Sequence, residues 1–333
     1  MTARKGPKND LTDAPGLKVG HAEDARARTG VTVILPDRPA ICGGDVRGGG
    51  PGTRETDLLD PASLVERVDA IVLAGGSSYG LGAADGVAAW LGARARGFKL
   101  VERAGVPPSP IVPAAILYDL ANGGDKNWGE DPPYRRLGHA ACATATAKAV
   151  RLGRAGAGFG ARAGAGPGGL GGASYVTEDG LVIGALVAVN SFGAVRMPGS
   201  DAFWAWPFEV DGEFGGARPA PDWRGASDMP PDTKRGASLH AAGRMNTTIG
   251  VVAVSAALSP AAARRVAIMA QDGLARAIRP VHGPTDGDAI FVLGMGEGAA
   301  PDPQMLTRLG VLAADCLARA VARGVFEAER QGG

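Results

Sequence analysis

The chain has 333 residues, of which 45% are hydrophobic and 21% charged, and its formal net charge is +1. Such a chain can bury a substantial core, and its charge balance is that of neither a basic nucleic-acid binder nor an acidic solvating protein. The three cysteines are widely spaced and contain no C-x-x-C pair, so the sequence suggests neither a disulfide framework nor a zinc site.

The N-terminus carries positive charge without a following apolar stretch, which argues against an ordinary signal peptide. No apolar run elsewhere is long enough to span a bilayer. We therefore expect a cytoplasmic protein that binds no membrane and no nucleic acid, and no motif calls for a cofactor or a metal.

The first half of the chain alternates short apolar runs with Ala-rich stretches. Pro61 at a first helical position after Asp60 as N-cap predicts a helix over residues 60–68. Gly97 and Gly153 are expected to end two Ala-rich helices. The elements predicted here are strands at 31–35 and 69–74 and helices at 60–68, 80–96 and 134–152.

The second half contains three continuous apolar runs, which are typical of strands buried on both faces. They cover residues 181–189, 249–254 and 289–293. Helices are predicted from Pro260 to Ile278 and from Pro303 to Val325. Buried strands with helices outside them indicate a layered α/β or α+β fold, and without a repeat or a clean linker we expect a single domain over residues 1–333.

The step from Asn246 to Thr247 lies at the threshold of the strand 249–254. If the chain breaks there, Thr247 becomes an N-terminus that carries both a nucleophilic hydroxyl and an amine to take its proton. That amine has a pKa of roughly 7.7 to 8.0, so part of it is unprotonated near neutral pH. A plain loop-to-strand junction is the alternative. The aperiodic segment 196–245, rich in Pro, Gly, Asp and Trp, favours cleavage because long aperiodic stretches are either disordered or functional.

A second candidate nucleophile is Ser78 in Gly76-Ser-Ser78-Tyr-Gly80, which matches G-x-S-x-G between a predicted strand and a predicted helix. A serine hydrolase would also need a histidine, and the downstream candidates are His139, His240 and His282. The alternative is a Gly-rich turn that approaches another backbone closely.

A Gly-rich stretch over residues 156–161 approximates the dinucleotide-binding pattern, but it follows a predicted helix instead of a strand, so nucleotide binding is disfavoured. Asp286 and Asp288 precede the strand 289–293. Acidic turn residues are common before strands. In a functional interpretation, one carboxylate orients an N-terminal ammonium or accepts a proton from it, and the other tunes that carboxylate, because adjacent carboxylates raise the pKa of one of the pair.

Together, several segments resemble one family, the self-processing L-aminopeptidase D-amidase/D-esterase family, which includes β-peptidyl aminopeptidases and nylon-oligomer hydrolases. The segments are residues 11–21, 29–35, 45–61, 74–81, 113–119, 187–190, 246–248 and 286–288. The resemblance implies an α+β fold, a four-layer αββα sandwich like that of N-terminal nucleophile hydrolases but with its own connectivity. It also implies self-cleavage into residues 1–246 and 247–333 and homo-oligomers of the cleaved heterodimers.

The resemblance places Thr247 at the family's nucleophile, Tyr79 at its active-site tyrosine and Asn190 at the asparagine of the oxyanion hole. The resemblance therefore implies that the turn around Ser78 serves to present Tyr79. Arg135 is aligned only loosely with a family lysine.

The function implied is amide hydrolysis. The Asp286-Gly-Asp288 pattern is similar to that of nylon-oligomer hydrolases, whereas β-peptidyl aminopeptidases have serine and glutamate there. The substrate is therefore either an N-terminal aminoacyl amide or an internal amide of an ω-amino acid oligomer. Acyl transfer, a Ser78 hydrolase and a non-catalytic oligomeric scaffold remain the alternatives.

Overall fold

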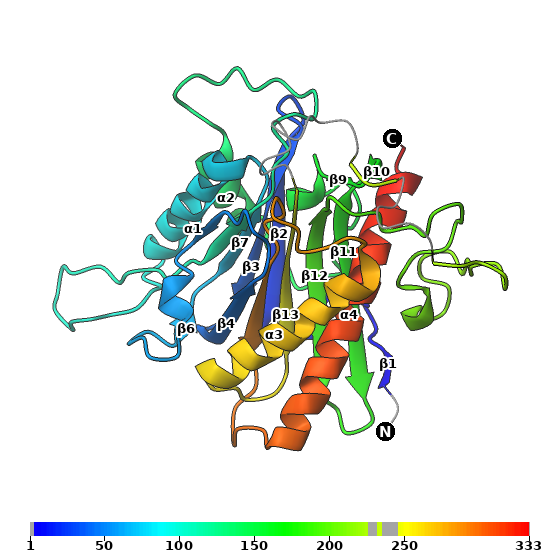
Figure 1. Ribbon diagram of the computed structural model, residues 1–333. Coiled ribbons are helices and arrows are strands. Elements are labelled where there is room, and N and C mark those ends of the chain that lie inside the picture. The colour runs from blue at the N-terminus through cyan, green and yellow to red at the C-terminus, as the bar shows by residue number, and fades with distance from the viewer. Residues whose placement is uncertain (1–2, 226–231, 235–245, 333) are drawn as a thin grey trace.

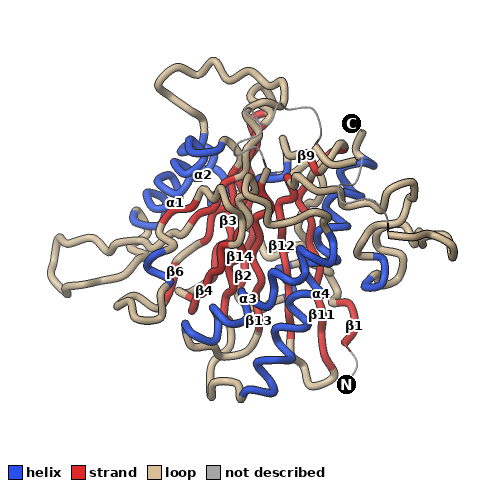
Figure 2. Tube along the Cα trace, in the orientation of Figure 1, coloured by secondary structure: helices blue, strands red, loops and turns tan. Residues whose placement is uncertain are grey.

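The structure, a computed structural model, describes residues 3–225, 232–234 and 246–332. Two β-sheets lie face to face, and helices cover the outer face of each (Figure 1). Figure 2 shows the same arrangement by element type, with the helices outside the strands. The fold is therefore the αββα sandwich that the sequence predicts.

The larger sheet has the strand order β1-β11-β12-β13-β14-β4-β6. Its neighbouring strands are antiparallel except β13 and β14, which are parallel and are joined through helix α3. Helices α3 and α4 cover its outer face. The elements are β1 (Ala3–Lys5), β4 (Ala40–Val46), β6 (Arg67–Val68), β11 (Gly169–Thr177), β12 (Val182–Asn190), β13 (Thr247–Val254), β14 (Ala289–Gly294), α3 (Pro260–Ala277) and α4 (Pro303–Arg330).

The smaller sheet has the order β2-β3-β7-β8-β5, and helices α1 and α2 cover it. Strands β7 and β8 are parallel, and α1 lies in the connection between them. The elements are β2 (Leu17–Asp24), β3 (Thr29–Pro36), β5 (Thr53–Arg54), β7 (Ile71–Ala74), β8 (Ala114–Ile116), α1 (Ala83–Gly92) and α2 (Tyr134–Ala143). A separate hairpin is formed by β9 (Arg162–Ala163) and β10 (Gly166–Pro167).

Both faces of the central strands are buried, which explains their continuous apolar sequences. Along β13, Ile249 and Val251 point into the core between the sheets, whereas Val252 and Val254 point toward α3 and α4. This is the two-residue period of a strand with an apolar layer on each side.

The helix predicted over residues 60–68 is wrong. The chain forms a 3-10 turn at Asp57–Leu59, a further turn in which Ala62 N–H donates to Asp60 Oδ1 over 2.9 Å, and then β6. Leu64 is 76% exposed, whereas Val68, which a helix would place on the same face, is buried in β6. The segment therefore does not bury one helical face, and a short helix without such packing is unstable in water.

The helix predicted over residues 134–152 ends nine residues early, at Ala143. Thr146 instead pairs with Val19 through two backbone hydrogen bonds of 3.0 Å, which extends the edge of the smaller sheet. Helix α1 begins at Ala83, after a 3-10 helix over Ser77–Gly82, and α4 continues to Arg330. The predicted strands at 31–35, 69–74, 181–189, 249–254 and 289–293 and the helix from Pro260 are confirmed to within two residues.

The segment after Arg196 is irregular as far as residue 225, apart from a 3-10 turn at Trp206–Phe208. This agrees with the aperiodic sequence. The remainder of that segment lies outside the described residues, except for residues 232–234.

Candidate active site

Three strand ends of the larger sheet bring the predicted site residues to one edge. Asn190 ends β12 and pairs in register with Thr247, which begins the antiparallel strand β13. Because β14 is parallel to β13, the loop that enters β14, with Asp286 and Asp288, reaches the same edge. All four residues are buried, with exposed fractions of 3% or less.

The peptide bond between Asn246 and Thr247 is held by hydrogen bonds at this edge. The Asn246 carbonyl oxygen accepts from the Thr247 hydroxyl and, over 2.9 Å, from the backbone N–H of Gly287. A Cβ on Gly287 would lie 2.7 Å from Thr247 Oγ1, so only glycine leaves room for the hydroxyl. The N–H of Gly287 thus points at the carbonyl that an attack by Thr247 would turn into an oxyanion.

The two carboxylates are held differently. Asp288 Oδ1 accepts from the Thr248 N–H over 2.7 Å, and Asp288 Oδ2 lies 2.9 Å from His282 Nδ1. Asp286 Oδ2 accepts from the Gly283 N–H over 2.7 Å. Its other oxygen is buried without a well-formed hydrogen bond within the described residues, and the Phe192 N–H adds only a weaker favourable interaction with the carboxylate.

This difference determines which carboxylate resists ionisation. Burial, and then the neighbouring charge of Asp288, raise the pKa of Asp286 to about 6. Two carboxylates this close cannot both ionise easily, and the one with fewer donors carries the raised pKa.

The side chain of Asn190 is fixed from both ends. Its Oδ1 accepts from the Arg162 backbone N–H over 2.9 Å, and its Nδ2 donates to the Tyr118 carbonyl over 3.0 Å. Tyr118 follows β8, so this contact connects the two sheets next to Thr247. An amide held in this way is preoriented.

Lys234 is a site residue that the sequence analysis did not identify. Its ammonium donates to the Asn190 carbonyl oxygen over 3.0 Å and to Asn190 Oδ1 over 3.3 Å. Burial lowers the pKa of Lys234 to about 7, an effect that the charge of Asp286 opposes. No periodic pattern in residues 196–245 distinguishes this lysine from the other cations there.

A cavity of about 410 Å³ opens beside Asn190. Tyr118, Asp119, Arg162 and Lys234 also line it, whereas Thr247 does not. Asn190 therefore reaches the cavity, while the hydroxyl of Thr247 is buried against the Asn246 carbonyl.

A model of the family described as peptidase family S58 matches residues 9–333. The chain belongs to this family. A protein of Mycobacterium tuberculosis named an uncharacterized aminopeptidase is 44% identical over 341 residues, covering 96% of this chain and 94% of that protein. A 6-aminohexanoate-oligomer endohydrolase of Kocuria sp. is 29% identical, covering 86% of this chain and 74% of that enzyme.

Solved structures show the same fold. A Burkholderia sp. β-aminopeptidase superposes with a TM-score of 0.71 at 23% identity, covering 97% of this chain and 88% of that one. The L-aminopeptidase D-Ala-esterase/amidase of Ochrobactrum anthropi, described as a variant of the Ntn hydrolase fold, superposes with a TM-score of 0.70 at 21% identity, covering 97% and 87%. As a member of peptidase family S58, the chain is an amide-bond hydrolase.

In this S58 peptidase Tyr79 lies apart from the other four predicted site residues. It is 51% exposed, and its ring packs edge-on against Trp128 with ring centroids 5.7 Å apart. Within the described residues its hydroxyl makes no hydrogen bond to Thr247 or Asn190. Arg135, the residue aligned with a family lysine, lies exposed on α2.

Ser78 does have the predicted setting of a nucleophile elbow, on an exposed 3-10 turn between β7 and α1. No described histidine hydrogen-bonds to it. His282 is engaged with Asp288, His139 lies on α2, and His240 is outside the described residues.

Within the described part, no helix is long and apolar enough to cross a membrane.

Proposed function

We propose that this S58 peptidase is a self-processing amide hydrolase whose nucleophile is Thr247 at a newly formed N-terminus. The observation that supports the proposal most is the arrangement around the Asn246 carbonyl. The Thr247 hydroxyl lies against this carbonyl group, whose carbon it would attack, and the Gly287 N–H donates to the oxygen on which the negative charge would develop.

In the precursor, Thr247 Oγ attacks the carbonyl carbon of Asn246, and the tetrahedral intermediate carries its negative charge on the oxygen that faces Gly287. The C–N bond then breaks, and the nitrogen of Thr247 leaves as an α-amine after taking the proton that the Thr247 hydroxyl lost. The resulting ester is hydrolysed by water, which restores the Thr247 hydroxyl and releases residues 1–246 with a free carboxylate.

In the mature enzyme, the α-amine of Thr247 takes the proton from its own hydroxyl as that hydroxyl attacks a substrate amide. Asp286 is suited to bind the ammonium that forms, because a buried oxygen of its carboxylate lacks a well-formed hydrogen bond in the uncut chain. The preoriented amide of Asn190, which pairs in register with Thr247, is suited to stabilise the substrate oxyanion. Tyr79, whose ring packs against Trp128, is the family's second donor to this oxyanion by resemblance.

The substrates that fit this chemistry are peptide-like amides and ω-amino acid oligomers. The relatives that are 44% identical are named aminopeptidases, and relatives that are 29% identical are named 6-aminohexanoate-oligomer endohydrolases. Assembly of the cleaved chains into a homo-oligomer remains a prediction.

The test is the intact mass of freshly expressed protein under denaturing conditions, followed by assays on aminoacyl p-nitroanilides and linear 6-aminohexanoate oligomers. We expect two fragments that meet at Asn246 and Thr247, and one uncut inactive chain for Thr247→Ala. Ser78→Ala is the matched control and should be cut and active. A cut or active Thr247→Ala variant would refute the proposal, and an inactive Ser78→Ala would favour the serine elbow.

A further inference from the structure

A second cavity of about 410 Å³ lies next to the one beside Asn190. Four residues, Asn122, Gly160, Arg162 and Ala165, line both, so the two form one continuous cleft. The walls of the second cavity come from the β2–β3 turn, the 3-10 turn before β9, and the β9–β10 hairpin.

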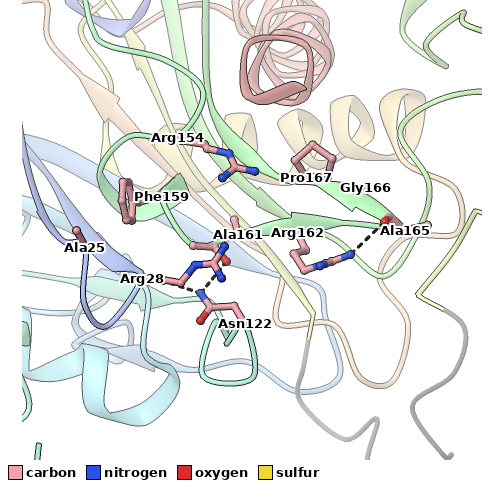
Figure 3. Close-up of a pocket in the computed structure, with 11 residues that line it drawn as sticks. Ala25, Arg28, Asn122, Arg154, Phe159, Ala161, Arg162, Ala165, Gly166 and Pro167 are labelled. Carbon is pink, nitrogen blue, oxygen red and sulfur yellow. Dashed lines mark hydrogen bonds between the residues drawn. The ribbon is translucent and has the colours of Figure 1, made fainter. Parts of the chain in front are cut away.

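Three arginines line this cavity, and none of its lining residues is acidic. Figure 3 shows Arg28 and Arg154 on opposite sides of the space with their guanidinium groups directed into it. Arg162 lies at the junction of the two cavities, where one guanidinium nitrogen donates to the Ala165 carbonyl over 3.2 Å.

The three guanidinium groups have no carboxylate within ion-pair distance among the residues that the structure describes. Three other arginines, on the β2–β3 turn, on helix α2 and in the loop before Arg154, do have a carboxylate partner. Arg26 lies 2.6 Å from Asp125, Arg136 lies 3.2 Å from Asp24, and Arg151 pairs with Glu23. These acidic side chains are thus engaged with other arginines, and Asp232, whose backbone carbonyl accepts from the Ala165 N–H over 2.8 Å, forms no ion pair in the described part of the chain. The three guanidinium groups that line the cavity therefore lack a carboxylate partner among the described residues.

Asp119, on the wall of the adjoining cavity, forms no ion pair with the three arginines within the described residues. Its two oxygens accept from the Thr29 hydroxyl over 2.6 Å and the Gly76 N–H over 2.8 Å. Burial also raises the pKa of Asp119, which favours its neutral form.

The remaining walls suit a short carbon chain. Phe159, Ala161 and Pro167 supply apolar parts of the wall of the second cavity. A guanidinium binds a carboxylate with two parallel hydrogen bonds, whereas a neutral amide lacks the charge to replace it.

We propose that Arg28, Arg154 and Arg162 form a carboxylate-binding subsite that recognises the free acid end of a short substrate whose amide lies beside Asn190. The proposal rests on the proposed function for the position of that amide. It favours short peptides and oligoamides with a free carboxylate over amidated or internal segments of long polymers.

The test is calorimetric binding of N-acetyl-6-aminohexanoate and N-acetyl-6-aminohexanamide, which differ only at the acid end, to the wild-type protein as expressed. We expect the carboxylate to bind about tenfold more tightly than the amide, the effect of one charge-assisted contact in a partly exposed cleft. Arg28→Gln and Arg154→Gln should each reduce that preference. Arg26→Gln, which removes an arginine already paired with Asp125, should keep it.

Three results would overturn the subsite. The two compounds bind equally, neither compound binds, or the preference for the carboxylate survives in the Arg28→Gln/Arg154→Gln double variant. The wild-type comparison needs no variant, so it stands even if a variant fails to fold. Binding is measured without turnover, which separates the two proposals. If the wild-type chain stays uncut but prefers the carboxylate, only the Thr247 mechanism is refuted. If the enzyme is cleaved and active but shows no preference for the carboxylate, only the subsite is refuted.

Discussion

Asn190 and Thr247 lie directly opposite each other on the antiparallel strands β12 and β13. A shift of one residue in this pairing would turn every side chain of one strand to the other face, where it would have to pack among neighbours of a different shape and size. The packing of the core therefore fixes the position of the amide relative to the hydroxyl.

The first prediction concerns Asn190 as an oxyanion donor. Asn190→Ala should lower kcat of the cleaved enzyme by about 10² to 10³, the usual effect of removing one such donor. Asn190→Asp should also lose activity. It can still accept from the Arg162 N–H, but it has no N–H to donate and adds a negative charge. The rates are normalised to the cleaved fraction measured by mass spectrometry, and a kcat within threefold of wild type would exclude the role.

The second prediction concerns the space at Gly287. Gly287→Ala should block or strongly slow self-cleavage, because the added methyl carbon would lie 2.7 Å from Thr247 Oγ1 and 3.0 Å from the Gly50 carbonyl oxygen. Gly82→Ala is the control, since its Cβ meets nothing within 4 Å. The fraction of cleaved chain after timed expression is measured for both variants. Wild-type cleavage of Gly287→Ala would show that the hydroxyl does not react from this position.

The third prediction is a pH dependence of stability caused by Asp286, measured in the uncut Thr247→Ala background. The pKa of Asp286 is raised from 3.8 to about 6, so folding favours the protonated carboxyl. The stability it contributes is fully present below pH 3.8 and is lost as the pH rises through about 6. Adding Asp286→Asn should therefore help stability more at pH 7 than at pH 4, by on the order of 2 to 3 kcal/mol.

Urea unfolding of the two proteins at pH 4, 5, 6 and 7 measures this difference. Because only Asp286 differs between them, other titrating groups cancel to first order. A difference that stays constant, or that grows toward low pH, would contradict a raised pKa.

Sequence patterns predicted the buried strands well because continuous apolar runs have few other solutions. Strand β11 escaped prediction because its first half is Gly-rich. Gly171 leaves the backbone close to α4, where a Cβ would lie 1.8 Å from the Ala320 carbonyl oxygen. Such a contact between distant segments leaves no periodic pattern in the sequence, and a glycine in the sequence is as typical of a turn as of a strand that packs closely against a helix.

The candidate site was predictable to a similar extent. Thr247, Asn190 and the two aspartates each stand at a strand end, and the register of the sheet brings them together as expected. Lys234, Arg28 and Arg154 come from loops and Arg162 from the two-residue strand β9. The approach of these segments depends on tertiary packing, so their sequence context carries no signal. Tyr79 carries the family pattern, but its side chain lies against Trp128.

The last prediction concerns what holds the two chains together after cleavage. Arg319 of α4 is fully buried, and its Nε lies 2.6 Å from Glu213 Oε1. It also donates to the Ser174 carbonyl and to Asn9 Oδ1, both over 2.8 Å. All three partners belong to residues 1–246, whereas Arg319 belongs to residues 247–333. This pair therefore crosses between the two proposed chains.

Arg319→Met should destabilise the protein by about 3 to 5 kcal/mol, because it removes the nearer of the two arginines that pair with the buried Glu213 carboxylate and leaves only Arg323, at 3.6 Å. Arg319→Met/Glu213→Leu should recover part of that loss, since it removes the buried carboxylate as well, and the loss that remains includes the contact between Glu213 and Arg323. Arg330→Gln is the control. Its ion pair with Glu327 is exposed, and its loss should change the free energy of unfolding by less than about 0.5 kcal/mol.

Urea unfolding of these variants in the uncut Thr247→Ala background gives the changes in stability, and size-exclusion chromatography of the cleaved proteins shows whether the fragments separate. A single Arg319→Met as stable as the control would mean that the apolar contacts of α4 suffice to hold the chains together.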